Sequence, residues 1–124
     1  MKQRITLLLA GLALLGLVAV QSAGAQQNKS DETTWTGKLS DAMCGADHKA
    51  NGGTVEKDHK CTLDCVKGHG SEYVFVNNAD KKIYKVGNQK FTALEAHAGH
   101  VIELTGKLKD DTITITKIVM PAGK

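Results

Sequence analysis

The sequence has few aromatic residues and little excess charge. Among its 124 residues there are one tryptophan, two tyrosines and two phenylalanines, so we expect an aliphatic core. Lysine and arginine number 16 against 13 acidic residues. This small excess gives no electrostatic reason to expect nucleic acid or an anionic membrane as a partner. We therefore expect Trp35, Tyr73 and Phe75 in the core, rather than in a platform that stacks single-stranded nucleic acid.

The sequence also lacks the motifs of common enzyme classes. It has no hydrolase-type serine turn, no phosphate-binding loop and no cysteine–histidine nucleophile motif. The C-x-x-C pair of thioredoxin-like proteins is absent, and a C-x-x-C-H haem attachment site is excluded because Val66 follows Cys65. We therefore predict a protein that is not an enzyme, and thiol–disulfide exchange through Cys61 and Cys65 is a minor alternative.

No apolar run reaches the ~20 residues that a membrane-spanning helix needs. The run Ile5–Val20 follows the basic residues Lys2 and Arg4 and precedes the small-residue triplet 23–25. This pattern is typical of a secretory signal peptide, here residues 1–25. Neither a basic stop-transfer cluster nor a cysteine follows the cleavage site. We therefore expect an exported protein, periplasmic or secreted, with no lipid anchor and no stable membrane insertion after signal cleavage.

The predicted mature chain forms a single domain. Cleavage after Ala25 removes Lys2 and Arg4 and leaves 99 residues, of which 14 are basic and 13 acidic, a net charge of +1. Residues 26–33 are polar and aperiodic, which predicts a flexible leader. Residues 34–120 are the predicted domain, and residues 121–124 are a short tail. A domain of this size buries a marginal core, so a disulfide or a metal would help to stabilise it.

Five segments have the alternation or the composition of β-strands: residues 34–39, 71–76, 82–86, 100–108 and 112–120. In the first, Trp35, Gly37 and Leu39 share one face. Gly37 leaves a gap on that face, as happens where another chain passes close to a barrel bend. In the last, the apolar face shifts by one residue between Ile115 and Ile118, which predicts a β-bulge.

Two short helices complete the predicted fold. Residues 60–67 and 91–98 each have a helical pattern that a glycine follows. The order of elements matches the five-stranded Greek-key barrel of the OB-fold, in which a short helix lies between strands 3 and 4. We therefore predict a mainly β, OB-like barrel with a cysteine-bearing loop–helix insert between strands 1 and 2. An open five-stranded α+β sandwich is the alternative.

The insert contains all three cysteines. Three residues separate Cys44 from His48 and also Cys61 from Cys65, and the second pair shares one face of the predicted helix. Two such pairs on either side of a flexible loop can bring four ligands to one tetrahedral site. Three thiolates and one imidazole suit Zn²⁺, and the same soft set suits Cu⁺. We therefore predict that the domain binds a soft transition metal at Cys44, His48, Cys61 and Cys65.

A disulfide is the alternative use of these cysteines. Exported proteins meet an oxidising compartment, where paired cysteines are the usual state. A bridge from Cys44 to Cys61 or Cys65 would close a long loop and stabilise the fold by roughly 3 kcal/mol. A bridge between Cys61 and Cys65 would be strained, because side chains four residues apart on a helix run roughly parallel. The domain would then be a structural or interaction module with an unknown protein partner.

The other histidines allow variants of the metal site. His59 or His69 could replace His48, since each flanks the predicted cysteine helix. His97 and His100 lie three residues apart and could reach one ion. We prefer the interpretation that both have structural roles and bind no metal. The helix dipole favours a histidine near a helix C-terminus, and His100 can begin the next strand.

One pattern of motifs extends over nearly the whole mature chain. The tryptophan strand leads into S-D-A-M-C-G at residues 40–45, and His48, the C-x3-C pair and the strand Tyr73–Val76 follow. A-H-A-G-H at residues 96–100 and L-T-G at residues 104–106 continue the pattern. In this respect the chain resembles a family of small exported bacterial proteins of unknown function. The resemblance implies an OB-like fold and no particular activity.

Overall fold

The fold is mainly β, as the sequence predicts. The structure is a computed structural model that describes residues 31–48 and 52–123. The predicted signal peptide and most of the predicted leader lie outside these residues. The strands are β1 (Glu32–Asp41), β2 (Tyr73–Asn77), β3 (Ile83–Val86), β4 (Val101–Lys109) and β5 (Thr112–Val119). The helical elements are α1 (Val55–Leu63), the π-helical η2 (Asp64–Gly68) and the short α2 (Leu94–His97), which lies between β3 and β4.

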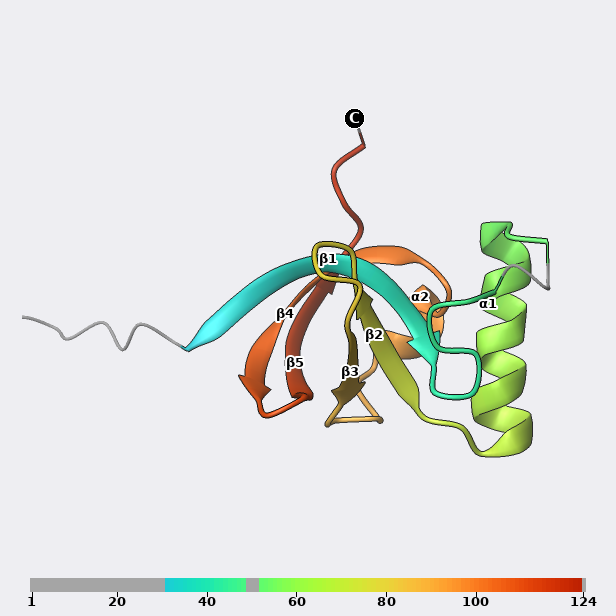
Figure 1. Cartoon of the computed structure of the whole chain (residues 1–124), viewed down its shortest axis with the longest axis horizontal. Coiled ribbons are helices and arrows are strands. Elements are labelled where there is room, and N and C mark those ends of the chain that lie inside the picture. The colour runs from blue at the N-terminus through green and yellow to red at the C-terminus, as the bar shows by residue number, and fades with distance from the viewer. Residues whose placement is uncertain (1–30, 49–51, 124) are drawn as a thin grey trace, which may run out of the picture.

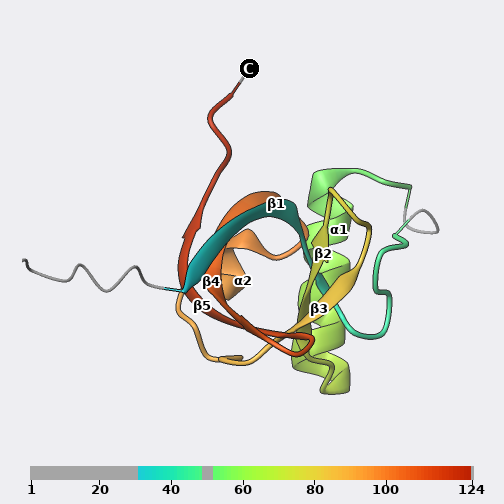
Figure 2. The same ribbon diagram turned by 60° about the vertical axis from the view of Figure 1, so that its left-hand side comes forward.

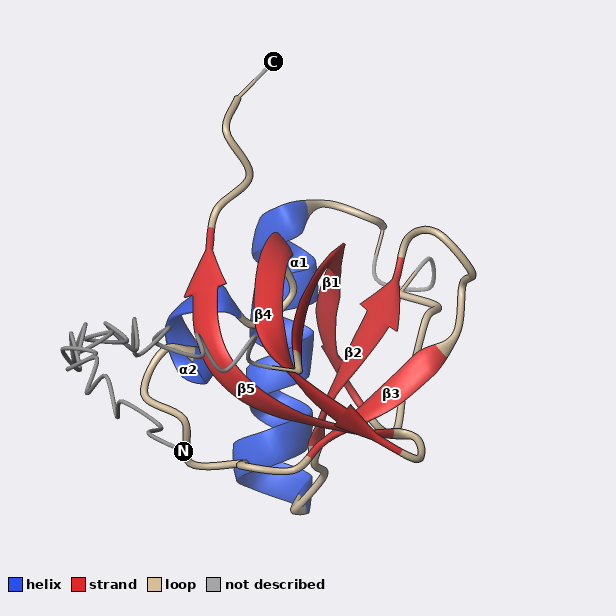
Figure 3. Cartoon of the chain, turned by 90° about the vertical axis from the view of Figure 1, so that its left-hand side faces the viewer, coloured by secondary structure: helices blue, strands red, loops and turns tan. Residues whose placement is uncertain are grey.

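The five strands form a mixed sheet that closes into a barrel in the order β1-β2-β3-β5-β4 (Figure 3). All neighbouring pairs are antiparallel except β3 and β5, which are parallel. The ring closes because β1 is long enough to pair with two strands. Residues 32–38 of β1 pair with β4, and residues 37–41 pair with β2. The end of β1 thus leaves the barrel next to β2.

Gly37 lies where the two pairings of β1 overlap. A Cβ atom at this position would lie 2.2 Å from the carbonyl oxygen of Val76 and 2.6 Å from the ring of Phe75. The predicted close approach at Gly37 is therefore confirmed. Only a residue without a side chain lets β1 bend across β2 at this point.

The predicted bulge in the last strand is also confirmed. Thr105 of β4 pairs with Lys117 of β5, whereas the next residue, Gly106, pairs with Ile115. Thr116 is thus the extra residue, and it restores the inward direction of Ile115 and Ile118 on either side of it. Met120, expected in the strand, lies beyond its end and is exposed.

The core is aliphatic with a few aromatic rings. Its largest fully buried side chains are those of Leu39, Phe75, Leu94, Ile102, Leu104 and Ile113. Trp35 is only half-buried and packs against this core, as do Leu63 and Val66 from the helical insert. The insert therefore adds its own apolar side chains to the barrel core.

The observed elements begin or end one to three residues from several predicted bounds, and the insert helix differs most. Helix α1 begins at Val55 rather than at Lys60, because the Thr54 side chain caps it by accepting a hydrogen bond from the Lys57 backbone N–H. Acidic residues in the first turn also favour this start. At the other end of the fold, β1 begins at Glu32, so residues 32 and 33 belong to the strand and not to the leader.

Helix α1 lies beside the barrel, next to β2 and the loop that follows β1 (Figures 1 and 2). This arrangement places the insert helix directly opposite the end of β1. Among residues 31–48 and 52–123, no helix has the length and apolar character needed to cross a membrane.

Candidate metal centre

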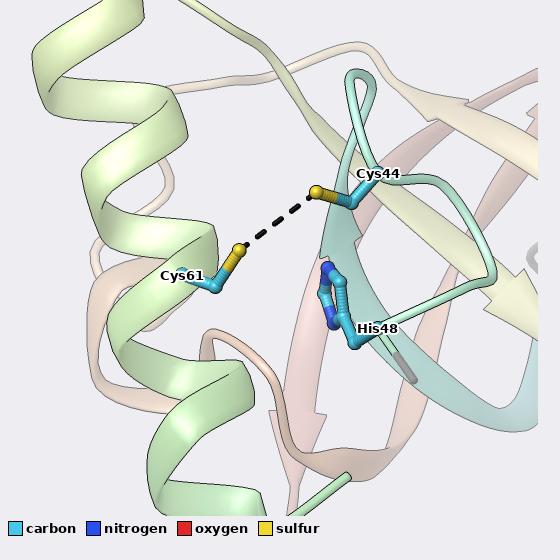
Figure 4. Close-up of side chains that lie close together, drawn as sticks. All are labelled: Cys44, His48 and Cys61. Atoms are coloured by element: carbon cyan, nitrogen blue, oxygen red, sulfur yellow. Dashed lines mark hydrogen bonds between the residues drawn. The ribbon is translucent and has the colours of Figure 1, made fainter. Parts of the chain in front are cut away.

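The candidate centre lies between the end of β1, the turn that follows it and one face of the insert helix. The turn carries Cys44 and leads to His48. The facing side of the helix carries Asp58, Cys61 and Cys65, which are spaced by three and four residues and so share a face. Figure 4 shows the side chains of Cys44, His48 and Cys61 pointing toward one another from these two segments.

The turn after β1 has a specific hydrogen-bond pattern. The Asp41 carboxylate accepts hydrogen bonds from the backbone N–H groups of Met43 and Cys44, both at 3.0 Å. The Ser40 hydroxyl donates to the Gly45 carbonyl oxygen at 2.6 Å, and Gly45 adopts a positive φ of 59°. These contacts give a physical reason for the motif S-D-x-x-C-G, since Ser, Asp and Gly together fix the position of Cys44.

The three cysteines are free thiols that meet around Cys44. The Sγ atoms of Cys44 and Cys61 lie 3.8 Å apart. Cys44, His48 and Cys61 form a group whose ligand atoms all lie within 4.8 Å of one another, and this group could hold a metal ion. Sulfur from before the insert and sulfur from its helix therefore converge, as the sequence predicts.

The fourth predicted ligand, Cys65, does not belong to this group, so the structure does not bring all four predicted ligands within 4.8 Å of one another. Cys65 forms a second such group with Cys44 and Asp41. Sequence analysis missed Asp41, which is fully buried beside the thiols. The only sequence signal for Asp41 was its place in the S-D-x-x-C-G turn. Neither His59 nor His69 belongs to the two groups, so the described structure offers no support for replacing His48 by either of them.

His48 lies between two buried carboxylates. Its Nε2 atom is 3.4 Å from Asp41 Oδ2, and its Nδ1 atom is 3.7 Å from Asp58 Oδ1. His48 and Asp58 are only 3% and 5% exposed, and Asp41 is completely buried. Lys38 forms an ion pair with Asp58 from the strand side. The region thus combines soft sulfur donors with a buried, net acidic set of oxygen atoms.

The surroundings of Cys44 and Cys65 oppose the ionisation of these two thiols. Burial raises the pKa of the Cys65 thiol to about 12, and the negative charge of Asp41 contributes to this shift. Burial also raises the pKa of Cys44, helped by its hydrogen bond to Cys61 and by Asp41. Both sulfurs are therefore protonated at neutral pH when no cation is near. The Asp41 charge that disfavours a thiolate would favour a bound cation at the same place.

An open hollow gives access to the thiols of the helix. Its volume is about 410 Å³. It is lined by Lys57, Lys60, Cys61, Asp64, Cys65 and His69. An ion can therefore approach two of the three sulfurs from solvent without opening the barrel.

Comparison with protein-family models, with curated proteins and with solved structures gives no match for this chain. The resemblance described above therefore stays a prediction. The function has to be argued from the residues of the centre itself.

Proposed function

We propose that this protein is an exported, non-enzymatic domain that binds one soft transition-metal ion, Zn²⁺ or Cu⁺, at its cysteine–histidine centre. The proposal is carried by one observation, the convergence of two sulfurs and one imidazole within 4.8 Å. Cys44, His48 and Cys61 are the proposed first three ligands, and Cys65 is the fourth.

The distance between the sulfurs favours a metal. Two thiolates bound to a tetrahedral Zn²⁺ at about 2.3 Å lie about 3.8 Å apart. The Sγ atoms of Cys44 and Cys61 have this separation, 3.8 Å. The thiols are thus held at the spacing of two metal ligands before any ion binds, so binding requires little rearrangement of this pair.

The fourth position has two candidate donors, the Cys65 thiol and the Asp41 carboxylate. Asp41 already accepts two backbone hydrogen bonds, which hold the turn around Cys44 together. Soft ions prefer thiolate to carboxylate. We therefore assign Cys65 as the ligand and Asp41 as the residue that shapes the turn and supplies nearby negative charge.

The proposed fold assignment is the OB-fold. Its support is the strand order β1-β2-β3-β5-β4, the closing pair of β1 with β4, and the helix between β3 and β4. In this assignment the insert between β1 and β2 carries the function. The proposal of export continues to depend on residues 1–25, where the sequence has the features of a signal peptide.

The second candidate function is a module stapled by a disulfide between Cys44 and Cys61. The same 3.8 Å distance favours it, since a small movement would bring these two sulfurs into bonding range. A thiol–disulfide exchanger has less support. Its attacking cysteine needs a lowered pKa, whereas burial raises the pKa of both Cys44 and Cys65.

Thiol counting with metal analysis separates the two candidates. Protein produced in a bacterial periplasm would be purified without chelator, and its metal content and free thiols would be measured before and after chelation. We expect one bound metal ion and three thiols that become reactive when the chelator removes it. One free thiol and no metal would contradict the metal proposal and support the staple.

A further inference from the structure

The three sulfurs of the centre differ in how solvent reaches them. Cys61 is partly exposed and lines the open hollow beside the helix. Cys44 is partly exposed but is not part of the lining of the hollow, and Cys65 lines the hollow but is buried. Burial also raises the pKa of both Cys44 and Cys65, so these two thiols stay protonated at neutral pH. Cys61 is therefore the sulfur that a small reagent from solvent reaches most directly.

The hollow around Cys61 has an excess of positive charge. Lys57 and Lys60 line it with the carboxylate of Asp64, so among the described lining residues two cations face one anion. The hydrogen bond to Asp64 raises the pKa of Lys60 most, and the charge of Cys61 adds to this rise. Cysteines that are partly exposed and lie beside basic side chains are those that react readily with oxidants. The surroundings of Cys61 are of this kind.

Cys44 lies opposite Cys61 as a second thiol. Figure 4 shows the two side chains pointing toward each other from the turn after β1 and from α1. Their Sγ atoms are 3.8 Å apart, so a closing movement of about 1.8 Å brings them to the ordinary disulfide length of about 2.05 Å. The Asp41 carboxylate holds the turn that carries Cys44. Cys44 is thus placed to react with an oxidised Cys61 sulfur.

We propose that Cys61 is a site of modification by hydroperoxides and that Cys44 resolves the product to a disulfide. The Cys61 sulfur attacks the peroxide, the O–O bond breaks, and the thiol proton leaves with the alcohol or water that is released. This step gives a sulfenic acid on Cys61. The Cys44 sulfur then attacks the sulfenic sulfur, an S–S bond forms, and the hydroxyl group leaves with the Cys44 proton as water. The two thiols are oxidised by two electrons, and the peroxide is reduced.

The modification would control the proposed metal centre, and this consequence rests on the proposed function. Thiolates bind metals, whereas the sulfurs of a disulfide do not serve as such ligands. Oxidation therefore removes two of the four proposed ligands and leaves His48 and Cys65, too few for a closed tetrahedral Zn²⁺ site. Zn²⁺ should leave the protein as the disulfide forms, and reduction of the disulfide should restore binding.

Disulfide mapping after peroxide treatment tests the modification without any metal. Reduced, metal-free protein would be treated with hydrogen peroxide, and its remaining thiols would then be alkylated under denaturing conditions. A protease that cleaves before aspartate separates Cys61 from Cys65 at Asp64, so mass spectrometry assigns each sulfur. We expect a Cys44–Cys61 disulfide and one alkylated thiol at Cys65. A bridge that joins Cys65 to either of the other cysteines as the main product would overturn the proposal.

A Cys44→Ser variant reveals the first step, because it lacks the resolving thiol. With a dione reagent that traps sulfenic acids, Cys61 should be labelled at least about tenfold more than Cys65, whose thiolate fraction is low at a pKa of about 12. In urea the two cysteines should be labelled to similar extents. Equal labelling in the folded variant would overturn the assignment of Cys61. If the variant does not fold, the disulfide map of the wild type decides.

Zinc release separates a failure of this inference from a failure of the proposed function. Zn²⁺-loaded protein would be treated with hydrogen peroxide beside a chromophoric zinc indicator, and we expect release of one equivalent in step with the Cys44–Cys61 disulfide. A disulfide that forms while Zn²⁺ stays bound would overturn control of the centre by oxidation. If the reduced protein binds no Zn²⁺, the proposed function fails, and the map of the metal-free protein still decides whether Cys61 is the modified residue.

Discussion

His48 Nδ1 lies 3.7 Å from Asp58 Oδ1, and both atoms are buried. Within residues 31–48 and 52–123, neither atom has a hydrogen-bond partner. If the ion binds the other ring nitrogen of His48, Nδ1 must carry the proton and can donate it to Asp58 after a small shift. A carboxylate behind a ligating histidine fixes its tautomer and orientation. Asp58 is therefore expected to support the metal centre without touching the ion.

Replacing this carboxylate should weaken metal binding. We expect Asp58→Asn to lower Zn²⁺ affinity by about 10–100-fold, the usual effect of losing such a carboxylate partner. The measurement is competition with a chromophoric chelator. Asp64→Asn is the matched control, because Asp64 lies at the start of η2, directly after α1, but is exposed and forms an ion pair with Lys60. Equal losses in both variants would contradict the role of Asp58.

His48 itself should be essential for tight binding. We expect His48→Ala to lower Zn²⁺ affinity by at least about 100-fold, more than the loss of its carboxylate partner would. The melting temperature of the metal-free variant should also fall, because Asp41 and Asp58 lose the imidazole between them. The informative quantity is thus the rise in melting temperature on adding Zn²⁺, which should largely disappear. A rise equal to that of the wild type would remove His48 from the ligand set.

The stability of a Cys44→Ser variant should distinguish a metal centre from a disulfide. A Cys44–Cys61 bridge would close a loop between residues 17 apart in sequence and stabilise the protein by roughly 3 kcal/mol. If the staple is the native state, Cys44→Ser should destabilise the protein equally with and without chelator. We expect instead that Cys44→Ser lowers the free energy of unfolding, measured with urea, mainly when metal is present. The reduced, metal-free wild type is the reference for both comparisons.

The raised pKa of Cys65 should be visible in its alkylation kinetics. Because its folded-state pKa is about 12, the thiol form dominates at lower pH, and the thiolate fraction rises about tenfold per pH unit. In metal-free protein, the rate with iodoacetamide should therefore keep rising from pH 8 to about pH 11. Mass spectrometry of the Cys65 peptide gives this rate. In denaturant the alkylation rate of Cys65 should stop rising above the ordinary cysteine pKa of 9.0. If the rate in the folded protein also stopped rising near pH 9, burial would not be raising the pKa of Cys65.

Much of the barrel followed from local pattern. The strands and the bulge at Thr116 were predictable because alternation in a strand records which face is buried. The close approach at Gly37 was predictable because glycine interrupted an otherwise apolar face. The first half of α1 was missed because Val55 is exposed and the turn carries no apolar stripe, so only the cap at Thr54 marks its start.

The candidate centre was predictable only in part. The equal spacing of Cys44–His48 and Cys61–Cys65 indicated that the two pairs would meet. The positions of Asp41 and Asp58 around His48 depend on how the helix packs against the end of β1, which no local pattern records. His59 joins His97 and His100 for the same reason, because the contact is made by the backbone at Gly99 and not by sequence spacing.

Gly99 should therefore be the residue on which the position of α1 depends. A Cβ atom there would collide with the backbone of His59 at 2.4 Å, and the positive φ of 75° is unfavourable for alanine. We expect Gly99→Ala to lower the free energy of unfolding by about 2–3 kcal/mol, in the range of overpacked sites. Because α1 carries Cys61, the variant should also bind less metal at the proposed cysteine–histidine centre.

Gly68→Ala is the matched control for this substitution. Gly68 ends η2, and a Cβ atom there would meet nothing within 4 Å. Its replacement should leave stability within about 1 kcal/mol of the wild type, since Gly→Ala without strain is neutral or slightly stabilising. Urea unfolding and Zn²⁺ affinity, measured on the two variants, make the comparison. If Gly99→Ala unfolds and binds like Gly68→Ala, then α1 is not held against the barrel by this contact. The cysteine–histidine centre would then have to be positioned in some other way.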